Sequence, residues 1–248
     1  MDLTSDRLFM IKSIKLMVKD WLAYCPLRET EHVRYVINKA SVSEQSFCPS
    51  YEGDFLYLLI RKNGFKTCLE TGFYTGSTAL YLLAGVIEVG GHVTSICLDR
   101  KDVIDKGIHL LSLLKYENFH KLVRKNSNEA LPELFLAGKR FDFVFVDGWK
   151  TFDHLVLEIY YINQMLQTGG MVVFDDSYMP SVRKAILILQ RYYGYEEVTY
   201  SDYNQSIRLR FFLFLTRLSF LYPYRAFKKV DDTSDQLPFK SWNFYSKI

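Results

Sequence analysis

A buried strand, a glycine turn and the start of a helix follow one another in residues 68–78, which read CLETGFYTGST. Ligands bind open α/β sheets at the carboxyl ends of the strands, close to the first crossover. Gly72 and Gly76 let the backbone turn sharply and approach a ligand, although an ordinary tight turn would also use them. Their spacing, G-x-x-x-G, differs from the G-x-G-x-x-G that wraps a pyrophosphate. Glu70, directly before the turn, favours a ligand with hydroxyl groups or positive charge over a phosphate.

Outward from this turn, buried strands alternate with segments of helical period. We expect strands over 66–71, 92–98, 121–124, 141–146 and 171–174, and helices over 6–24, 28–40, 51–63, 78–89, 103–116, 129–136, 152–167 and 182–193. A cap at Ser127 or Asn128 would open the helix over 129–136. Alternation of this kind implies right-handed crossovers and a parallel sheet covered by helices on both faces. Residues 196–200 and 207–216 flank a turn and predict an antiparallel hairpin at the sheet edge.

The composition is that of a packed protein. Of the 248 residues, 49% are hydrophobic and 24% are charged, and the net charge is +3. A disordered chain would have too little apolar surface, and so balanced a charge does not favour a nucleic-acid partner. The sequence has no run of 18 apolar residues free of charge, so it predicts no transmembrane helix. The four cysteines form no C-x-x-C pair, which predicts buried thiols rather than disulfides or zinc ligands. Together with the lack of a recognisable signal peptide, this predicts a cytoplasmic location.

Acidic residues stand at the ends of three predicted strands. Asp99 follows the second strand, where acids of nucleoside-binding folds hydrogen-bond ribose hydroxyls. Asp147 follows the strand over 141–146, and Asp175 and Asp176 follow the strand over 171–174. If these two strands are neighbours, three carboxylates meet at one sheet edge, and such hard oxygen ligands suit Mg²⁺ or a similar cation. Acids that merely cap the following helices are the alternative, but the adjacent nucleoside site favours a metal.

Three motifs over about residues 51–190 resemble those of the class I S-adenosylmethionine-dependent O-methyltransferases of the catechol and caffeoyl-CoA type. They are YEGDFL at 51–56, LETGFYTG at 69–76 and DGWK at 147–150. The resemblance implies the Rossmann-like methyltransferase fold, an α/β fold whose mostly parallel seven-stranded sheet has an antiparallel edge hairpin and helices on both faces. It also implies an enzyme that methylates a hydroxyl of a small molecule bearing adjacent oxygens, with S-adenosylmethionine and Mg²⁺ or a similar divalent cation.

The same resemblance assigns roles position by position. Its cofactor-binding residues are Glu70, Gly72, Tyr74, Gly76, Thr78, Asp99, Ser127, Asp147 and Trp149. Of these, Glu70, Gly72 and Tyr74 would line the methionine and sulfonium end. Asp99 would hold the ribose, Ser127 would contact the adenine, and Trp149 would pack against the adenine or the site wall. The metal ligands would be Asp147, Asp175 and Asp176, and the catalytic residues Asp147 and Lys150. Lys150 would be the general base if burial and the nearby cation lower its pKa.

Two departures leave the acceptor open among a catechol-like aryl diol, a sugar diol and another natural product. The catechol group has Asn where Asp176 stands, and similar bacterial sugar O-methyltransferases carry His in place of Lys150. Two other functions also compete. A nicotinamide-dependent oxidoreductase is disfavoured by the missing third glycine and by Glu70. A binding module that lost catalysis is disfavoured because Asp147, Lys150, Asp175 and Asp176 are all present.

We divide the chain into an N-terminal helical extension (1–50), a methyltransferase domain (51–216) and an aromatic-rich C-terminal extension packed on that domain (217–248). The N-terminal helices are compatible with a homodimer. Between 207 and 230, basic and aromatic residues are interleaved without an acid. Such a segment is typical of membrane-surface contact, or else it holds the final strand and a lid over the acceptor. Pro223 would interrupt a long interfacial helix, which favours the strand and lid.

Overall fold

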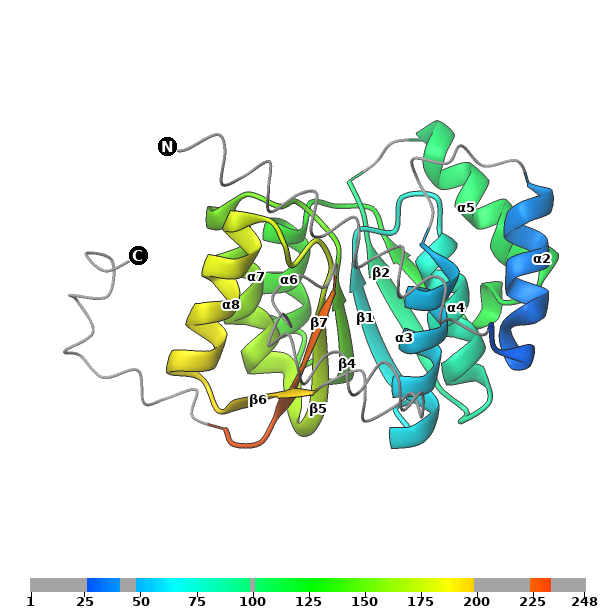
Figure 1. Ribbon diagram of the computed structural model, residues 1–248. Helices are drawn as coiled ribbons and strands as arrows, with labels where there is room; N and C mark the ends of the chain where they lie inside the picture. Colours follow the sequence, from blue (N-terminus) through cyan, green and yellow to red (C-terminus); the bar gives the residue numbers. More distant parts are fainter. Residues whose placement is uncertain (1–25, 41–47, 99–100, 199–223, 233–248) are drawn as a thin grey trace, which may run out of the picture.

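The computed structural model describes residues 26–40, 48–98, 101–198 and 224–232. Seven strands form one sheet in the order β3-β2-β1-β4-β5-β7-β6 (Figure 1). The parallel strands are β1 (Thr67–Thr71), β2 (His92–Ile96), β3 (His120–Val123), β4 (Phe141–Val146) and β5 (Leu166–Phe174). At the other edge, β7 (Arg225–Lys229) runs antiparallel to both β5 and β6 (Tyr195–Val198). The predicted fold class is therefore confirmed.

Helices cover both faces of the sheet (Figure 1). One face carries α2 (Glu31–Lys39), α3 (Ser50–Asn63), α4 (Ser77–Ile87) and α5 (Lys101–Leu113), and the other carries α6 (Ser127–Leu136), α7 (Phe152–Met165) and α8 (Pro180–Tyr192). Short 3₁₀ helices lie at Arg28–Thr30 and Glu117–Phe119. Side chains alternate between the two faces along each strand, so Phe143 and Phe145 pack under α3 and α4 while Val144 and Val146 pack under α6 to α8.

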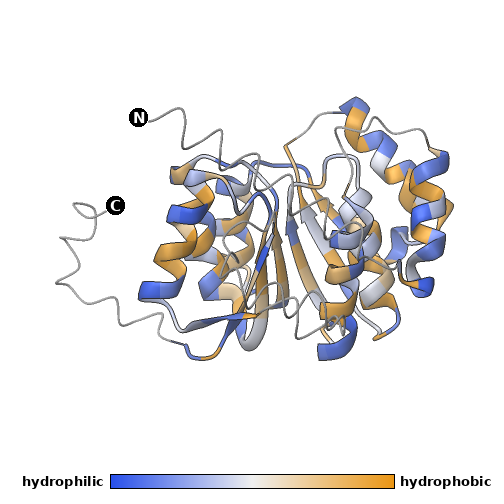
Figure 2. Cartoon of the chain, viewed as in Figure 1, coloured by the Kyte–Doolittle hydropathy of each residue, from blue (hydrophilic) through white to orange (hydrophobic). Residues whose placement is uncertain are grey.

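Local sequence explains how several helices are bounded and oriented. Gly64 ends α3 in the left-handed conformation, at a φ of 67°. In α2, the expected apolar stripe of Val33, Val36 and Ile37 is buried. Figure 2 shows hydrophilic residues on the remaining surface of α2, as expected for a helix with one buried face. The predicted helix over 6–24 lies outside the described residues.

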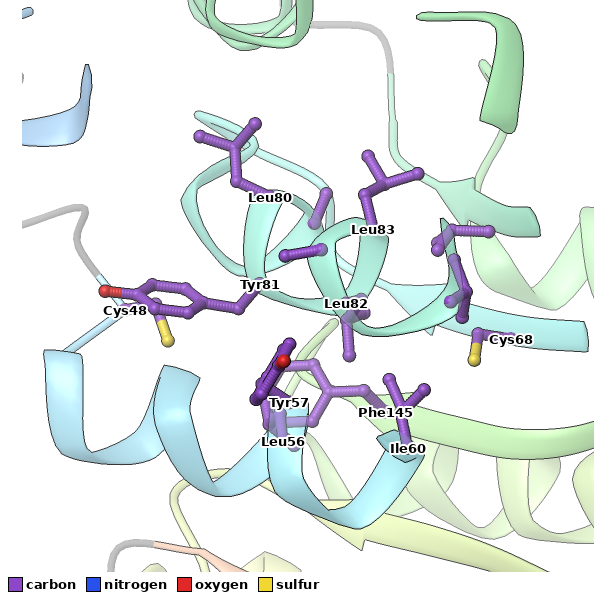
Figure 3. Close-up of a cluster of buried hydrophobic side chains, with 14 of the residues drawn as sticks. Cys48, Leu56, Tyr57, Ile60, Cys68, Leu80, Tyr81, Leu82, Leu83 and Phe145 are labelled. Atoms are coloured by element: carbon purple, nitrogen blue, oxygen red, sulfur yellow. The ribbon is translucent and has the colours of Figure 1, made fainter. Parts of the chain in front are cut away.

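Helices α3 and α4 approach each other closely beside the sheet. A Cβ atom on Gly53 of α3 would lie 2.4 Å from the ring of Tyr81 on α4, so this position has room for glycine alone. Figure 3 shows the Tyr81 ring among Cys48, Leu56 and other apolar side chains of this cluster. The close packing holds the first turn of α3, with Glu52, against the same edge of the sheet as the glycine turn.

Three expectations about element bounds were wrong. Strand β5 begins at Leu166 instead of Met171, so it includes Gly169 and Gly170. The N-cap of α6 is Asn126 instead of Ser127 or Asn128. The partner of β6 is β7 at Arg225–Lys229, within the segment assigned to the C-terminal extension, while the expected strand over 207–216 lies outside the described residues.

Two expectations from composition can be compared with the described part of the chain. Cys48, Cys68 and Cys97 are free thiols, and the first two are buried. No helix among the described residues is long and apolar enough to cross a membrane.

Candidate active site

The carboxyl ends of β1, β4 and β5 meet at one edge of the sheet. The register pairs Thr71 of β1 with Val146 of β4, and Val146 with Phe174 of β5. The ladder continues one residue further, since the Asp147 N–H donates to the Thr71 carbonyl at 2.9 Å and the Asp175 N–H to the Val146 carbonyl at 3.0 Å. These hydrogen bonds fix the backbone from which both aspartates project, and the expected adjacency of the two strands is confirmed.

Three aspartates converge at this edge. Carboxylate oxygens of Asp147, Asp175 and Asp176 lie within 4.8 Å of one another, a spacing that could hold one cation. Asp176 adopts a φ of 51°, which is uncommon for a residue with a side chain but is tolerated by aspartate. Such a conformation at a turn carries a cost of about 1 kcal/mol or more, and strained residues are concentrated at functional sites.

Lys150 lies over the same cluster. Its Nζ is 2.9 Å from Asp147 Oδ1 and 3.7 Å from Asp176 Oδ2. Burial lowers the pKa of Lys150, but Asp147, Asp175 and Asp176 raise it by more, so that the net shift is upward. With only the described protein groups around it, Lys150 is therefore an ammonium group. The expected lowering of its pKa by burial is present but is outweighed by the carboxylates.

Burial and mutual repulsion act on the aspartates. Burial, followed by the neighbouring Asp147 charge, raises the pKa of Asp175 to about 7. Burial also raises the pKa of Asp147, against the opposing effect of Lys150. A site in which carboxylates resist ionisation is one that a cation would stabilise, since the cation would offset both the repulsion and the loss of hydration.

The glycine turn lies directly against these strand ends. Gly72 has a φ of 100°, and a Cβ atom there would lie 2.3 Å from the Asp147 carbonyl oxygen. The N–H of Gly72 donates to the Ile96 carbonyl at 2.8 Å. Tyr74 adopts a φ of 42° and is 39% exposed, and Gly76 begins α4 with a φ of 73°. The turn therefore brings bare backbone to the acidic edge, as its sequence predicts.

Glu70 lies beneath the turn and is fully buried. Its Oε2 accepts a hydrogen bond from the Ser95 hydroxyl at 2.6 Å, whereas its Oε1 has no partner among the described residues. Burial raises the pKa of Glu70 to about 8, although the hydrogen bond from Ser95 acts to lower it. A buried carboxylate oxygen without a partner is costly unless a ligand satisfies it.

The other predicted cofactor residues are placed less uniformly. Thr78 is buried in the first turn of α4, and Ser127 is buried at the start of α6. Trp149 is 63% exposed, with its ring centroid 6.3 Å from that of His154. Asp99 lies outside the described residues. The roles of all four residues stay predictions.

Two buried carboxylates beside the site were not singled out from the sequence. Glu52 of α3 is 5% exposed and its Oε1 has no described partner; burial and the charges of Asp175 and Asp147 raise its pKa. Glu158 of α7 is fully buried, and its Oε2 accepts a hydrogen bond from the Thr71 hydroxyl at 3.3 Å. The sequence does carry a hint of Glu158, because this acid interrupts the apolar stripe of its helix.

Comparison with known proteins connects this geometry to a family. Residues 69–177 match a family model described as a methyltransferase domain. The chain carries a class I methyltransferase domain. The matched residues include the glycine turn, Asp147, Lys150, Asp175 and Asp176, and the expected resemblance to the class I O-methyltransferases is confirmed.

Individual relatives of this methyltransferase domain are distant. A caffeoyl-CoA O-methyltransferase of Populus kitakamiensis is 28% identical over 154 residues, which are 61% of each chain. The chain spans only 54% and 61% of the length of two curated relatives that it matches.

Solved structures show the same fold. An O-methyltransferase from Bacillus cereus, in complex with S-adenosylhomocysteine, has a TM-score of 0.61 and 16% identity, over 88% of this chain and 97% of that one. The O-methyltransferase TomG from Streptomyces achromogenes, in complex with S-adenosylmethionine, has a TM-score of 0.61 and 15% identity, over 87% of this chain and 95% of that one.

Proposed function

We propose that this protein transfers the methyl group of S-adenosylmethionine to a hydroxyl of a small molecule bearing adjacent oxygens, with Mg²⁺ or a similar divalent cation. One observation carries the proposal: Asp147, Asp175, Asp176 and Lys150 gather at a single sheet edge, directly against the glycine turn of a methyltransferase domain. The acceptor is a catechol-like diol or a sugar diol.

The residues around the turn suit this donor. S-adenosylmethionine carries a sulfonium and an ammonium group, and the unpartnered Oε1 of Glu70 is a buried acceptor beside the turn. The positive charge of the donor would favour the ionised form of Glu70. Gly72 has no side chain and packs its backbone on the Asp147 carbonyl, which leaves the turn open to close approach. When bound, the donor supplies an electrophilic methyl group. The protein contributes orientation, which is a large part of the rate of such a transfer.

The aspartates suit a hard divalent cation. Their oxygens lie within 4.8 Å of one another, and carboxylates with room for water are the ligands that Mg²⁺ prefers. When bound, such a cation would lower the pKa of an acceptor hydroxyl and align two adjacent oxygens. Asp147, Asp175 and Asp176 would hold it, and its charge would offset that of the carboxylates and lower the pKa of Lys150, which lies over the cluster. Once the Lys150 ammonium has lost its proton, its Nζ is the atom that we assign to receive the hydroxyl proton.

The test is a screen for donor consumption over catechols and glycosides, with and without Mg²⁺. We expect turnover of one acceptor class that EDTA abolishes and Mg²⁺ restores. Lys150→Met should lower the chemical step by about 100-fold or more, with little change in calorimetric affinity for S-adenosylhomocysteine. Full turnover in EDTA would contradict the role of the cation.

A thermal-shift measurement separates the competing functions. S-adenosylhomocysteine should raise the melting temperature because a ligand that binds the native state stabilises it. A rise with NAD instead would favour an oxidoreductase, and binding of S-adenosylhomocysteine without turnover of any acceptor would favour a non-catalytic module. The cytoplasmic location, the homodimer and the domain boundaries stay predictions.

A further inference from the structure

A chain of three hydrogen-bonded side chains runs across three neighbouring strands below the glycine turn. Ser95 of β2 donates to Glu70 Oε2 at 2.6 Å, and the His120 Nε2 of β3 lies 2.8 Å from the Ser95 hydroxyl. The parallel register pairs Glu70 with Ser95 directly, and it pairs His120 with Val93, two residues before Ser95 on the same face. Glu70 and Ser95 are fully buried.

The number of protons available sets the donor and acceptor in each of these hydrogen bonds. The Ser95 hydroxyl has one proton, which it donates to the Glu70 carboxylate, so that its oxygen must accept a hydrogen bond from His120. Burial lowers the pKa of His120 to about 4, so the imidazole is neutral at pH 7. When Glu70 is ionised, the single proton of this imidazole is therefore on Nε2. If Glu70 is protonated instead, each hydrogen bond can reverse. This hydrogen-bonded chain therefore gives the Oε2 of Glu70 a partner in both protonation states.

His120, the last residue of this hydrogen-bonded series, packs against the glycine turn. The His120 ring stacks on Phe73, with the ring centroids 5.0 Å apart. Phe73 directly follows Gly72, and its ring packs so closely that a Cβ atom on Gly76 would lie 2.9 Å from it. Any displacement of His120 would therefore change its contacts with the turn as well as its hydrogen bond to Ser95.

We infer that Ser95 and His120 are positioning residues of the donor site. Together they hold the Glu70 carboxylate by Oε2, keep its Oε1 available to the cationic methionine end of the donor, and tie it to the glycine turn through Phe73. The inference rests on the proposed function, because it requires that the site bind S-adenosylmethionine.

Few other described groups affect the ionisation of Glu70. Among the described residues, its pKa responds to burial and to the Ser95 hydrogen bond, and no charged side chain contributes. Its neighbour on β4 is the apolar Phe145, and Cys68 lies on the same face of β1 as a buried thiol. Removing the Ser95 hydroxyl should therefore disfavour the carboxylate and shift its ionisation to higher pH.

The experiment compares Ser95→Ala with Ser95→Thr, which restores the hydroxyl. Thr94→Ala is the matched control, because it removes a hydroxyl of the same strand next to Ser95. Affinity for S-adenosylhomocysteine is measured by calorimetry between pH 6 and 9. We expect Ser95→Ala to weaken binding about tenfold at pH 7 and to move the pH midpoint of binding upward. Ser95→Thr and Thr94→Ala should behave like the wild type.

His120→Phe gives a second measurement that does not depend on Ser95→Ala folding. Phenylalanine can keep the stack on Phe73 but cannot donate to Ser95, so the pH midpoint should again move upward. In the wild type with S-adenosylhomocysteine bound, which favours the ionised form of Glu70, ¹⁵N spectra should show His120 protonated on Nε2. An unchanged affinity and pH midpoint in both variants, with the wild type binding S-adenosylhomocysteine, would overturn the positioning role alone. A wild type that does not bind S-adenosylhomocysteine would overturn the proposed function itself.

Discussion

Glu70 illustrates how a single buried acid links stability to pH. Its pKa is about 8 in the folded protein, raised mainly by burial, against an ordinary value of 4.5. Between these two values the folded state holds a proton that the unfolded state has lost. The stabilising contribution of the protonated form is complete below pH 4.5 and is lost as the pH rises toward 8. A cationic ligand beside Glu70 would favour its ionised form and would oppose this loss.

We therefore predict that Glu70→Gln flattens the pH dependence of stability in the absence of donor. The wild type should lose up to about 1.4 kcal/mol of stability per pH unit relative to the variant, between about pH 5 and 8. Urea unfolding at several pH values measures this difference. Parallel curves for the two proteins would mean that Glu70 is ionised throughout this range.

Asp176 is the residue at which the charge of the proposed metal site can be changed with least disturbance. Asparagine also tolerates a positive φ, so Asp176→Asn should keep the backbone at its φ of 51°. Losing one negative charge should weaken Mg²⁺ binding about tenfold, which is about 1.4 kcal/mol. The rate at saturating Mg²⁺ should be unchanged or higher, because a less neutralised cation acidifies a hydroxyl more strongly.

Isothermal titration with Mg²⁺ and initial rates at saturating Mg²⁺ test this prediction. Asp153→Asn is the matched control, since it makes the same chemical change at an exposed residue of α7. Equal Mg²⁺ affinity in the wild type and Asp176→Asn would remove Asp176 from the ligand set.

At the scale of elements, the sequence located those parts of the site that depend on local order. Asp147 and Lys150 follow β4, Asp175 and Asp176 follow β5, and the pairing of these strands brings the four residues together. Glu52 and Glu158 reach the site from helices through tertiary packing. The only local sign of this is at Glu158, which interrupts the apolar stripe of α7. The start of β5 was missed because glycines normally mark a turn, whereas here Gly169 and Gly170 lie inside a strand.

Lys229 shows how an element is stabilised by a distant residue. This lysine of β7 is 1% exposed, and its Nζ donates to the carbonyl oxygens of Asn163 at 2.7 Å and Leu166 at 3.0 Å. Asn163 lies in the last turn of α7 and Leu166 is the C-cap residue that follows it, at the end of a helix where carbonyl groups lack donors of the helix itself. Its Nζ also lies 3.0 Å from Asp232 Oδ1.

We predict that Lys229→Met destabilises the protein by about 2 kcal/mol, because it leaves buried carbonyls without a donor. For a chain of this size that loss corresponds to a fall of about 4–8 °C in melting temperature. Lys228→Met is the control, since Lys228 is the exposed neighbour on the same strand. Calorimetric melting of both variants measures the difference, and equal melting temperatures would show that water can replace Lys229.

For the whole molecule, the alternation of strands and helices was enough to predict the parallel part of the sheet. The last strand was not predicted, because three of its five residues are basic and such a segment usually lies at the surface. Its place is set by long-range contacts. Arg225 donates to both carboxylate oxygens of Glu197, at 2.7 and 2.6 Å, and Lys229 is buried against α7. Such pairing between distant segments produces no local periodicity from which the strand could be predicted.

The position of β7 predicts which truncations the fold can tolerate. Strand β7 lies between β5 and β6, so a chain ending after Thr216 would lose the partner of both strands and expose the apolar edge of β5. We expect that chain to be insoluble or to unfold without a cooperative transition. A chain ending after Asp232 keeps β7 and the contact between Lys229 and Asp232, and it should melt cooperatively and bind S-adenosylhomocysteine. Cooperative melting of the chain ending after Thr216, at the temperature of the full protein, would mean that β7 is dispensable to the sheet.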